Sequence, residues 1–146
     1  MNVVIESAKV YHFPEIYRIE QAAFSDPWSK LLLWGKLQDP QVQFIVAADG
    51  EQLLGFAIFR PVGPEAELLN LAVDPHLRRR GVGRALLSHL IRAGRAAGVE
   101  AIYLEVRESN AGATSLYQAM GFQAFGRRRG YYENPVEDAI CMRALI

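Results

Sequence analysis

Apolar residues occur along the chain in short continuous or alternating runs, which are typical of β-strands. Such runs predict strands over residues 3–7, 44–48, 53–60, 67–73, 101–106, 123–132 and 139–145. Asp49-Gly50 separates the second and third of these runs and predicts a hairpin, with the exact turn left open by Glu51. The chain is therefore expected to form a sheet in which hairpins join several neighbouring strands.

Between these runs, apolar residues recur at helical spacing. A first helix is expected to begin near Pro14, which suits a first turn, and to end before Asp26-Pro27. Its apolar face carries Ile16, Ile19 and Ala23. Ser29 can cap a second, short helix that continues through Leu37.

Two further helices are expected in the second half of the chain. One begins near Val82 and closes at Gly98, and the other covers residues 110–120 and ends at Gly121. The apolar face of the earlier one carries Val82, Leu86, Leu90 and Ala93. Because this helix lies between two strands, it predicts a parallel strand pair joined by a crossover. The fold class is therefore α/β, with a mixed sheet in a single domain over residues 1–146.

The turn between the strand at 67–73 and the third helix combines glycine with arginine. Gly81 and Gly83 permit backbone dihedrals and a close approach that a Cβ would forbid, so several N–H groups can point at one anion. The N-terminus of the helix adds free N–H groups and the positive end of its dipole. Mobile positive charge is supplied by Arg78, Arg79, Arg80 and Arg84. This turn is predicted to bind phosphate.

Two familiar phosphate motifs do not fit this turn. A P-loop needs lysine and then serine or threonine after its second glycine, where this chain has Arg84 and Ala85. A dinucleotide fingerprint needs a third glycine or alanine three residues after Gly83, where this chain has Leu86.

Composition limits the classes of partner. Sixteen basic residues balance sixteen acidic ones, so net charge gives no reason to expect nucleic acid or a membrane. No stretch approaches the length of a membrane span, and the N-terminus lacks a signal-peptide pattern, so we expect a cytoplasmic protein. Cys141, the single cysteine, fits a reducing compartment and is expected to be a packed core thiol. The three histidines lack metal-ligand spacing, and we expect no metal.

The turn matches the pattern Gln/Arg-x-x-Gly-x-Gly/Ala at Arg78, Gly81 and Gly83, and in this it resembles the GNAT superfamily of N-acetyltransferases. The resemblance continues downstream in order and spacing. It includes the segments Leu104-Glu105-Val106-Arg107, Ser109-Asn110-Ala111, Leu116-Tyr117 and Met120-Gly121-Phe122. It implies a central, mostly antiparallel sheet with flanking helices, in which one parallel strand pair splays apart.

The resemblance also implies acetyl-coenzyme A as co-substrate. Its pantetheine arm would lie between the splayed strands and pair with the backbone of Leu71, Ala72 and Val73. N–H groups from Arg79 to Arg84, including that of Val82, would hold the pyrophosphate. The N–H of Val73 is then the candidate donor to the thioester oxyanion.

Transfer of an acetyl group to an amine requires a base, and Glu105 is the candidate. An α-amino group has a pKa of about 7.7 to 8.0, so it needs only modest help to lose its proton. Free glutamate is a weak base at neutral pH, so the carboxylate would have to be buried or act by holding the amine. Arg107, two residues on, would work against the effect of burial on this carboxylate, because it favours the ionised form. The alternative role for Glu105 is a strand-end acid paired with an arginine.

The departing coenzyme thiolate requires an acid, for which Tyr117 is the candidate. Its alternative role is that of a core tyrosine in a helix. Asn110, at the start of the same helix, is either an N-cap or a coenzyme contact, and the resemblance implies the contact.

Within the superfamily the chain is most similar to the RimI family, bacterial enzymes that acetylate the N-terminal alanine of a small-subunit ribosomal protein. This similarity rests on Ile19-Glu20, residues 24–29, residues 128–132 and Glu137-Asp138-Ala139-Ile140. It implies that Trp28, Tyr131 and Tyr132 line a groove for a protein N-terminus, although these aromatic residues can also be ordinary packing. It implies no direct role for nucleic acid.

Two other functions remain open at the level of sequence. The same scaffold can acetylate a lysine side chain or a small-molecule amine, because only the acceptor groove would differ. The chain can also be a binding module, either a catalytically silent coenzyme A sensor or an arginine-dependent binder of RNA or the ribosome.

Overall fold

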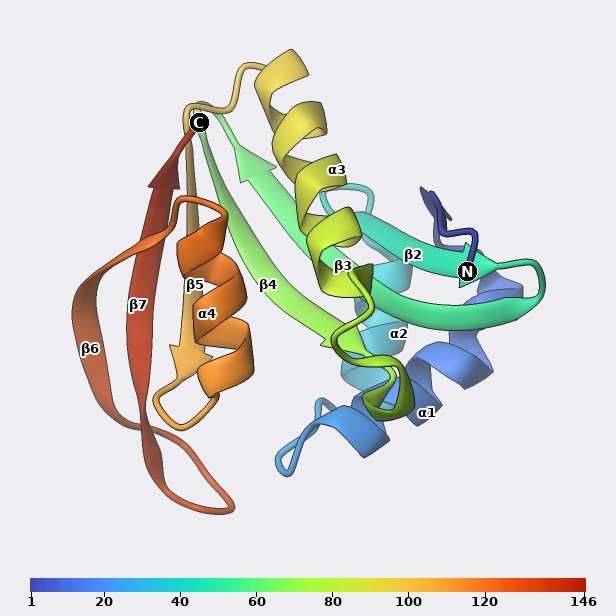
Figure 1. Cartoon of the computed structure of the whole chain (residues 1–146), viewed down its shortest axis with the longest axis horizontal. Coiled ribbons are helices and arrows are strands. Elements are labelled where there is room, and N and C mark those ends of the chain that lie inside the picture. The colour runs from blue at the N-terminus through green and yellow to red at the C-terminus, as the bar shows by residue number, and fades with distance from the viewer.

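The computed structural model of the chain describes residues 1–146 and contains one seven-stranded sheet (Figure 1). In space the strands follow the order β1-β2-β3-β4-β5-β7-β6. Their bounds are β1 Val4–Ser7, β2 Gln43–Asp49, β3 Gln52–Val62, β4 Glu65–Val73, β5 Ala101–Arg107, β6 Gln123–Tyr132 and β7 Glu137–Leu145. All seven predicted strands are confirmed, and β3 and β4 extend toward each other as far as a turn in which Gly63 has a φ of +62°.

Helices cover both faces of the sheet. Figure 1 shows α3 (Val82–Ala96) and α4 (Ala111–Ala119) on the near face, with α1 (Phe13–Ala23) and α2 (Lys30–Gln38) behind the sheet. Short 3-10 turns cover Val10–His12 and Pro75–Leu77. The four predicted helices are confirmed, and the Ser29 hydroxyl caps α2 by accepting a hydrogen bond from the Leu32 N–H at 3.1 Å. No helix of the chain has the length and apolar character needed to cross a bilayer.

Each face of the sheet has its own hydrophobic core. The core under α3 and α4 includes Leu86, Leu90 and Tyr117, and the core under α1 and α2 includes Ile16, Ile19 and Phe56. Alternate residues of the central strands supply both, because successive side chains of a strand point to opposite faces. The helices are therefore held to the sheet mainly by burial of apolar surface.

β4 and β5 form the only parallel pair, as the sequence predicts. Their pairing runs from Glu65↔Ala101 to Glu67↔Tyr103 and does not continue. Beyond Glu67, β4 also shifts register against β3, since Ile58 faces Asn70 but Phe59 faces Leu68. This β-bulge turns β4 away from β5, and the two strands separate toward their carboxyl ends. The separation creates the space in which the candidate site lies.

Candidate functional site

Three neighbouring cavities follow the separation of β4 and β5 from one face of the sheet to the other. We call the first the arginine groove: a cavity of about 430 Å³ on the side of α3 and α4. The central pocket, of about 140 Å³, lies between the strands. The aromatic trough, of about 630 Å³, continues on the opposite face. Phe24, Asn110 and Tyr117 line both of the first two cavities, whereas Trp28, Glu105 and Tyr132 line both of the last two.

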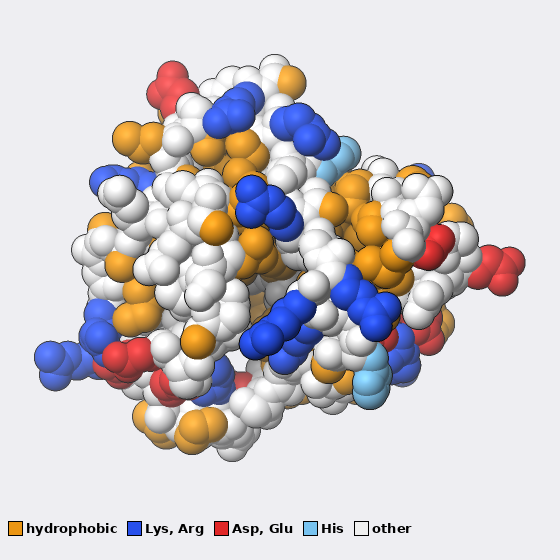
Figure 2. Space-filling model, viewed as in Figure 1, with side chains coloured by type: hydrophobic (Ala, Val, Ile, Leu, Met, Phe, Trp, Pro, Cys, Tyr) orange, Lys and Arg blue, Asp and Glu red, His pale blue; other side chains and the backbone are white.

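The arginine groove contains most of the residues predicted to bind the coenzyme. These are Leu71, Ala72, Val73, Arg78, Arg79, Gly81, Val82, Gly83, Arg84 and Asn110. Figure 2 shows basic side chains around a hollow on this face and hydrophobic side chains deeper inside it. The hollow thus combines a charged rim with an apolar interior, as expected for a ligand that carries phosphates at one end and a thioester at the other.

The two glycines of the turn have different roles. Gly81 is the N-cap of α3 and has a φ of +82°, a left-handed conformation that other residues rarely adopt. At Gly83 the backbone is ordinary, but a Cβ would lie 3.1 Å from the Leu116 Cδ2 of α4. Gly81 therefore shapes the turn, and Gly83 lets α3 approach α4.

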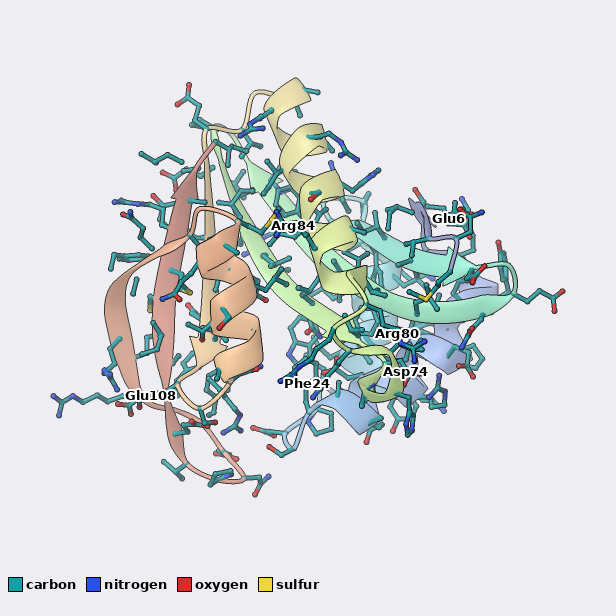
Figure 3. All side chains as sticks on the ribbon, in the orientation of Figure 1. Glu6, Phe24, Asp74, Arg80, Arg84 and Glu108 are labelled. Carbon is teal, nitrogen blue, oxygen red and sulfur yellow. The ribbon has the colours of Figure 1, made fainter.

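The N-terminus of α3 offers free backbone donors to the groove. The first bond of this helix runs from the Ala85 N–H to the Gly81 carbonyl at 3.0 Å. The N–H groups of residues 82–84 therefore have no partner within the helix. Arg84 projects from this end of α3 toward the space beside α4 in Figure 3. Backbone dipoles and arginine charge thus converge on one location.

Arg80 is the one residue of the predicted coenzyme set that does not line the groove. Figure 3 places it on the other side of the turn from the gap between α3 and α4. Arg79, directly before Arg80, has a positive φ of 63°, so the backbone bends within the run of arginines. The sequence alone cannot tell which arginine of the run faces outward.

Glu105 and Tyr117 reach the central pocket from opposite faces of the sheet. Tyr117 comes from α4 and also lines the arginine groove, while Glu105 comes from β5 and also lines the aromatic trough. Tyr117 is 6% exposed, and burial raises the pKa of its phenol. Its proton is therefore retained throughout the physiological pH range. The same small cavity is thus flanked by a phenol that keeps its proton and by an ionisable carboxylate.

Glu105 is paired with an arginine, but not with the one predicted from the sequence. Its carboxylate lies 3.0 Å from Nε of Arg128 in β6. Arg107 instead bonds to Glu137 at 2.8 Å and to the carbonyl of Pro135 at 3.0 Å. The expectation that Arg107 acts on Glu105 is therefore wrong, because the hairpin between β6 and β7 already occupies its guanidinium.

The aromatic residues predicted to bind the acceptor do line the trough and the pocket. Trp28 and Tyr132 border both cavities, and Tyr131 borders the trough. The Arg107 guanidinium lies 4.7 Å from the centre of the Tyr132 ring. Burial, ahead of the Glu105 charge, raises the pKa of Tyr132 to about 12. Arg107 thus contacts both the hairpin between β6 and β7 and the Tyr132 ring, which lines the central pocket and the trough.

Asn110 performs the first of its two predicted roles while remaining available for the second. Its side-chain oxygen accepts a hydrogen bond from the Ala113 N–H at 3.2 Å, so it is the N-cap of α4. The residue also lines the arginine groove and the central pocket. Cys141, as expected, is a buried free thiol in β7.

Glu20 is a site residue for which no role was predicted from the sequence. It lies on the apolar face of α1, is 1% exposed and lines the central pocket. Its carboxylate accepts from the Trp28 N–H at 2.9 Å and from Asn70 Nδ2 at 2.8 Å. It therefore ties the loop after α1 to the bulged part of β4. The sequence does contain a signal for this residue: it is a glutamate four residues after Ile16, on an otherwise apolar helix face.

Replacement of Glu20 by glutamine is expected to raise the free energy of unfolding at pH 7. Burial raises the pKa of Glu20 above its usual 4.5, despite two hydrogen bonds that lower it, so the ionised form destabilises the folded state. Below about pH 4 the carboxyl is protonated in both states, and the difference from wild type should disappear. Urea unfolding at pH 7 and pH 4 measures this. A variant less stable than wild type at pH 7 would mean that the bonds from Trp28 and Asn70 outweigh burial.

The chain is similar to known acetyltransferases along most of its length. Residues 13–122 match the family model described as "Acetyltransferase (GNAT) family". A Salmonella typhimurium protein named "[Ribosomal protein bS18]-alanine N-acetyltransferase" is 43% identical over 131 residues, which cover 88% of each chain. A Mycobacterium tuberculosis protein named "N-alpha-acetyltransferase RimI" is 38% identical over 122 residues, which cover 81% of this chain and 75% of that protein.

A solved structure gives the same result for the fold. The crystal structure of the ribosomal-protein-S18-alanine N-acetyltransferase from Escherichia coli superposes with a TM-score of 0.92 at 39% identity. The match covers 99% of this chain and 94% of that one. The match thus extends over the residues that line the three cavities of this chain.

Proposed function

The chain belongs to the acetyltransferase (GNAT) family, and on that premise we propose that it transfers the acetyl group of acetyl-coenzyme A to the N-terminal alanine of ribosomal protein bS18. It is an acyltransferase, as its curated relatives are. We take residues 1–146 as one catalytic domain. A ribosomal-protein acceptor would place the reaction in the cytoplasm.

The observation that carries the proposal is the position of Glu105 and Tyr117 around one small pocket. Tyr117 lies toward the arginine groove, where the phosphates and thioester of the coenzyme would enter. Glu105 lies toward the aromatic trough, by which a peptide would approach. The reaction takes a proton from the amine on one side of the reacting atoms and gives a proton to the sulfur on the other side. Glu105 and Tyr117 line the pocket from two corresponding sides.

The thioester carbonyl has a candidate donor in β4. The Asp74 N–H donates to the Leu54 carbonyl of β3 at 2.9 Å. Because successive N–H groups of a strand point to opposite sides, that of Val73 points into the space between β4 and β5. A backbone donor held in this way can stabilise the charge that develops on the carbonyl oxygen.

In the proposed reaction the amine attacks the thioester directly. Glu105 accepts a proton from the acceptor ammonium, directly or through a water, and the free amine forms a bond to the acetyl carbon. The bond from carbon to sulfur then breaks as Tyr117 donates its proton to the departing thiolate. The second proton of the attacking nitrogen is lost to water, and Tyr117 recovers a proton from water before the next turnover. Both substrates would have to be bound at once, because the pocket lies between their two entrances. No role for a metal is required in these steps.

The first residue of the acceptor should be small. The central pocket is about 140 Å³ and is bordered by Trp28, Tyr132 and Phe24, so it leaves room for little more than an alanine and the acetyl group. Intact, unacetylated bS18 should gain one acetyl group on its α-amine when incubated with the enzyme and acetyl-coenzyme A, as located by fragmentation in the mass spectrometer. A bS18 variant with leucine as first residue is the control. Acetylation on lysine, or equal acetylation of both proteins, would contradict the proposal.

A further inference from the structure

Glu105 is already bound to a cation before any acceptor arrives. The Arg128 Nε lies 3.0 Å from its carboxylate, and Tyr131 lines the same cavity as Glu105. Tyr132 and Cys141 complete the surroundings on this side. Arg107 points to the hairpin, so Arg128 is the only cation bound to Glu105. An acceptor α-ammonium that pairs with this carboxylate would compete with the guanidinium that is already bound to it.

We propose that Arg128 is a resident counter-ion for Glu105 that the α-ammonium of the acceptor displaces on binding. This inference rests on the proposed function, because it assigns Glu105 to the acceptor amine. Arg128 is then a positioning residue, which pairs with the carboxylate until the α-ammonium of the acceptor replaces it. An acceptor with a blocked terminus has no cation to exchange, so this step selects charged amines.

The exposure of the pair permits such an exchange. The side chain of Arg128 is 60% exposed and that of Glu105 is 30% exposed. Ion pairs of this kind contribute little to stability, so replacing one cation with another costs little. Arg128 also has a nearby surface on which to rest, since its guanidinium carbon lies 5.7 Å from the centre of the Tyr131 ring.

The neighbouring arginine provides a matched control. Arg127 precedes Arg128 in β6 and bonds to Glu108 and Asp138, each at 2.9 Å, away from the three cavities. Arg127→Gln removes the same charge as Arg128→Gln without releasing Glu105. Comparison of the two variants therefore distinguishes the loss of the Glu105 counter-ion from the loss of one positive charge in β6.

The test is the dissociation constant of an alanine-initiated peptide, measured by calorimetry in the presence of coenzyme A. Arg128→Gln should bind the peptide about two- to fivefold more tightly than wild type, since no guanidinium competes. Arg127→Gln should not differ from wild type, and Arg128→Lys should lie between wild type and Arg128→Gln. In steady state, the KM for the peptide should fall in Arg128→Gln while kcat remains nearly unchanged.

A double-mutant cycle shows whether the effect passes through Glu105. In the Glu105→Gln background, substitution of Arg128 and of Arg127 should have equal, small effects on peptide binding. Weaker binding in Arg128→Gln would overturn the proposal, because Arg128 would then contact the acceptor itself. Equal effects of Arg127→Gln and Arg128→Gln in the protein that retains Glu105 would also overturn it. Failure of the wild-type enzyme to turn over the peptide at all would instead contradict the proposed function.

Discussion

Glu105→Gln is expected to lower kcat at pH 7 by about 10²- to 10⁴-fold, the range in which general bases usually contribute. Glutamine keeps the size and polarity of the side chain but cannot accept the proton of the acceptor ammonium. The defect should shrink as the pH rises past about 8, where an α-amine loses its proton to water without help. Affinity for acetyl-coenzyme A should be nearly unchanged, because Glu105 does not line the arginine groove.

The pH dependence of kcat decides between the roles of Glu105. Glu108→Gln is the control, because this acid follows β5 closely, pairs with Arg127 and lies outside the three cavities. It should retain wild-type rates at every pH. A loss in Glu105→Gln that is the same at pH 7 and pH 9 would remove the base role and leave Glu105 as a group that only holds the amine.

Tyr117→Phe is expected to slow thiol release by about one to two orders of magnitude. Burial raises the pKa of this phenol, so it keeps its proton at neutral pH and can donate it to the departing thiolate. Phenylalanine keeps the ring, whose centre lies 5.7 Å from that of Phe122, so the core under α4 should be preserved. The variant should therefore unfold at the same urea concentration as wild type.

Thioesters with more acidic thiols test the same role independently of folding. A thiol of low pKa leaves without a proton, so acetyl transfer from such a donor should be nearly as fast in Tyr117→Phe as in wild type. Wild-type rates with acetyl-coenzyme A itself would assign Tyr117 to packing. An equal defect with every donor would place its contribution in a step other than departure of the thiol.

Local patterns predicted most of the fold because the relevant interactions are local. Apolar spacing located the strands and helices, and the order of elements around Gly81 and Gly83 predicted the parallel pair. The position of Glu105 and Tyr117 on one pocket follows from that pair, since the strand and the next helix border the same gap. The resemblance supplied their roles, which remain proposals.

The errors concern contacts that depend on register between distant strands. Arg107 lies two residues from Glu105 and so shares its face of β5, which made it the natural partner by sequence. In the structure, Glu105 lies opposite Cys141 of β7, and Cys141 lies opposite Gly126 of β6. A register shift near Gly126 then brings Arg128 to the carboxylate. Neither the shift nor the hairpin bonds that occupy Arg107 can be deduced from spacing along one strand.

The most direct test of the account is thiol release from acetyl-coenzyme A with two short peptides. Both begin with alanine and contain lysine, and one has its α-amine blocked. Turnover is expected with the free terminus and not with the blocked one, because only the former presents an α-ammonium to Glu105. Equal turnover with both peptides would contradict it and assign the enzyme to side-chain amines.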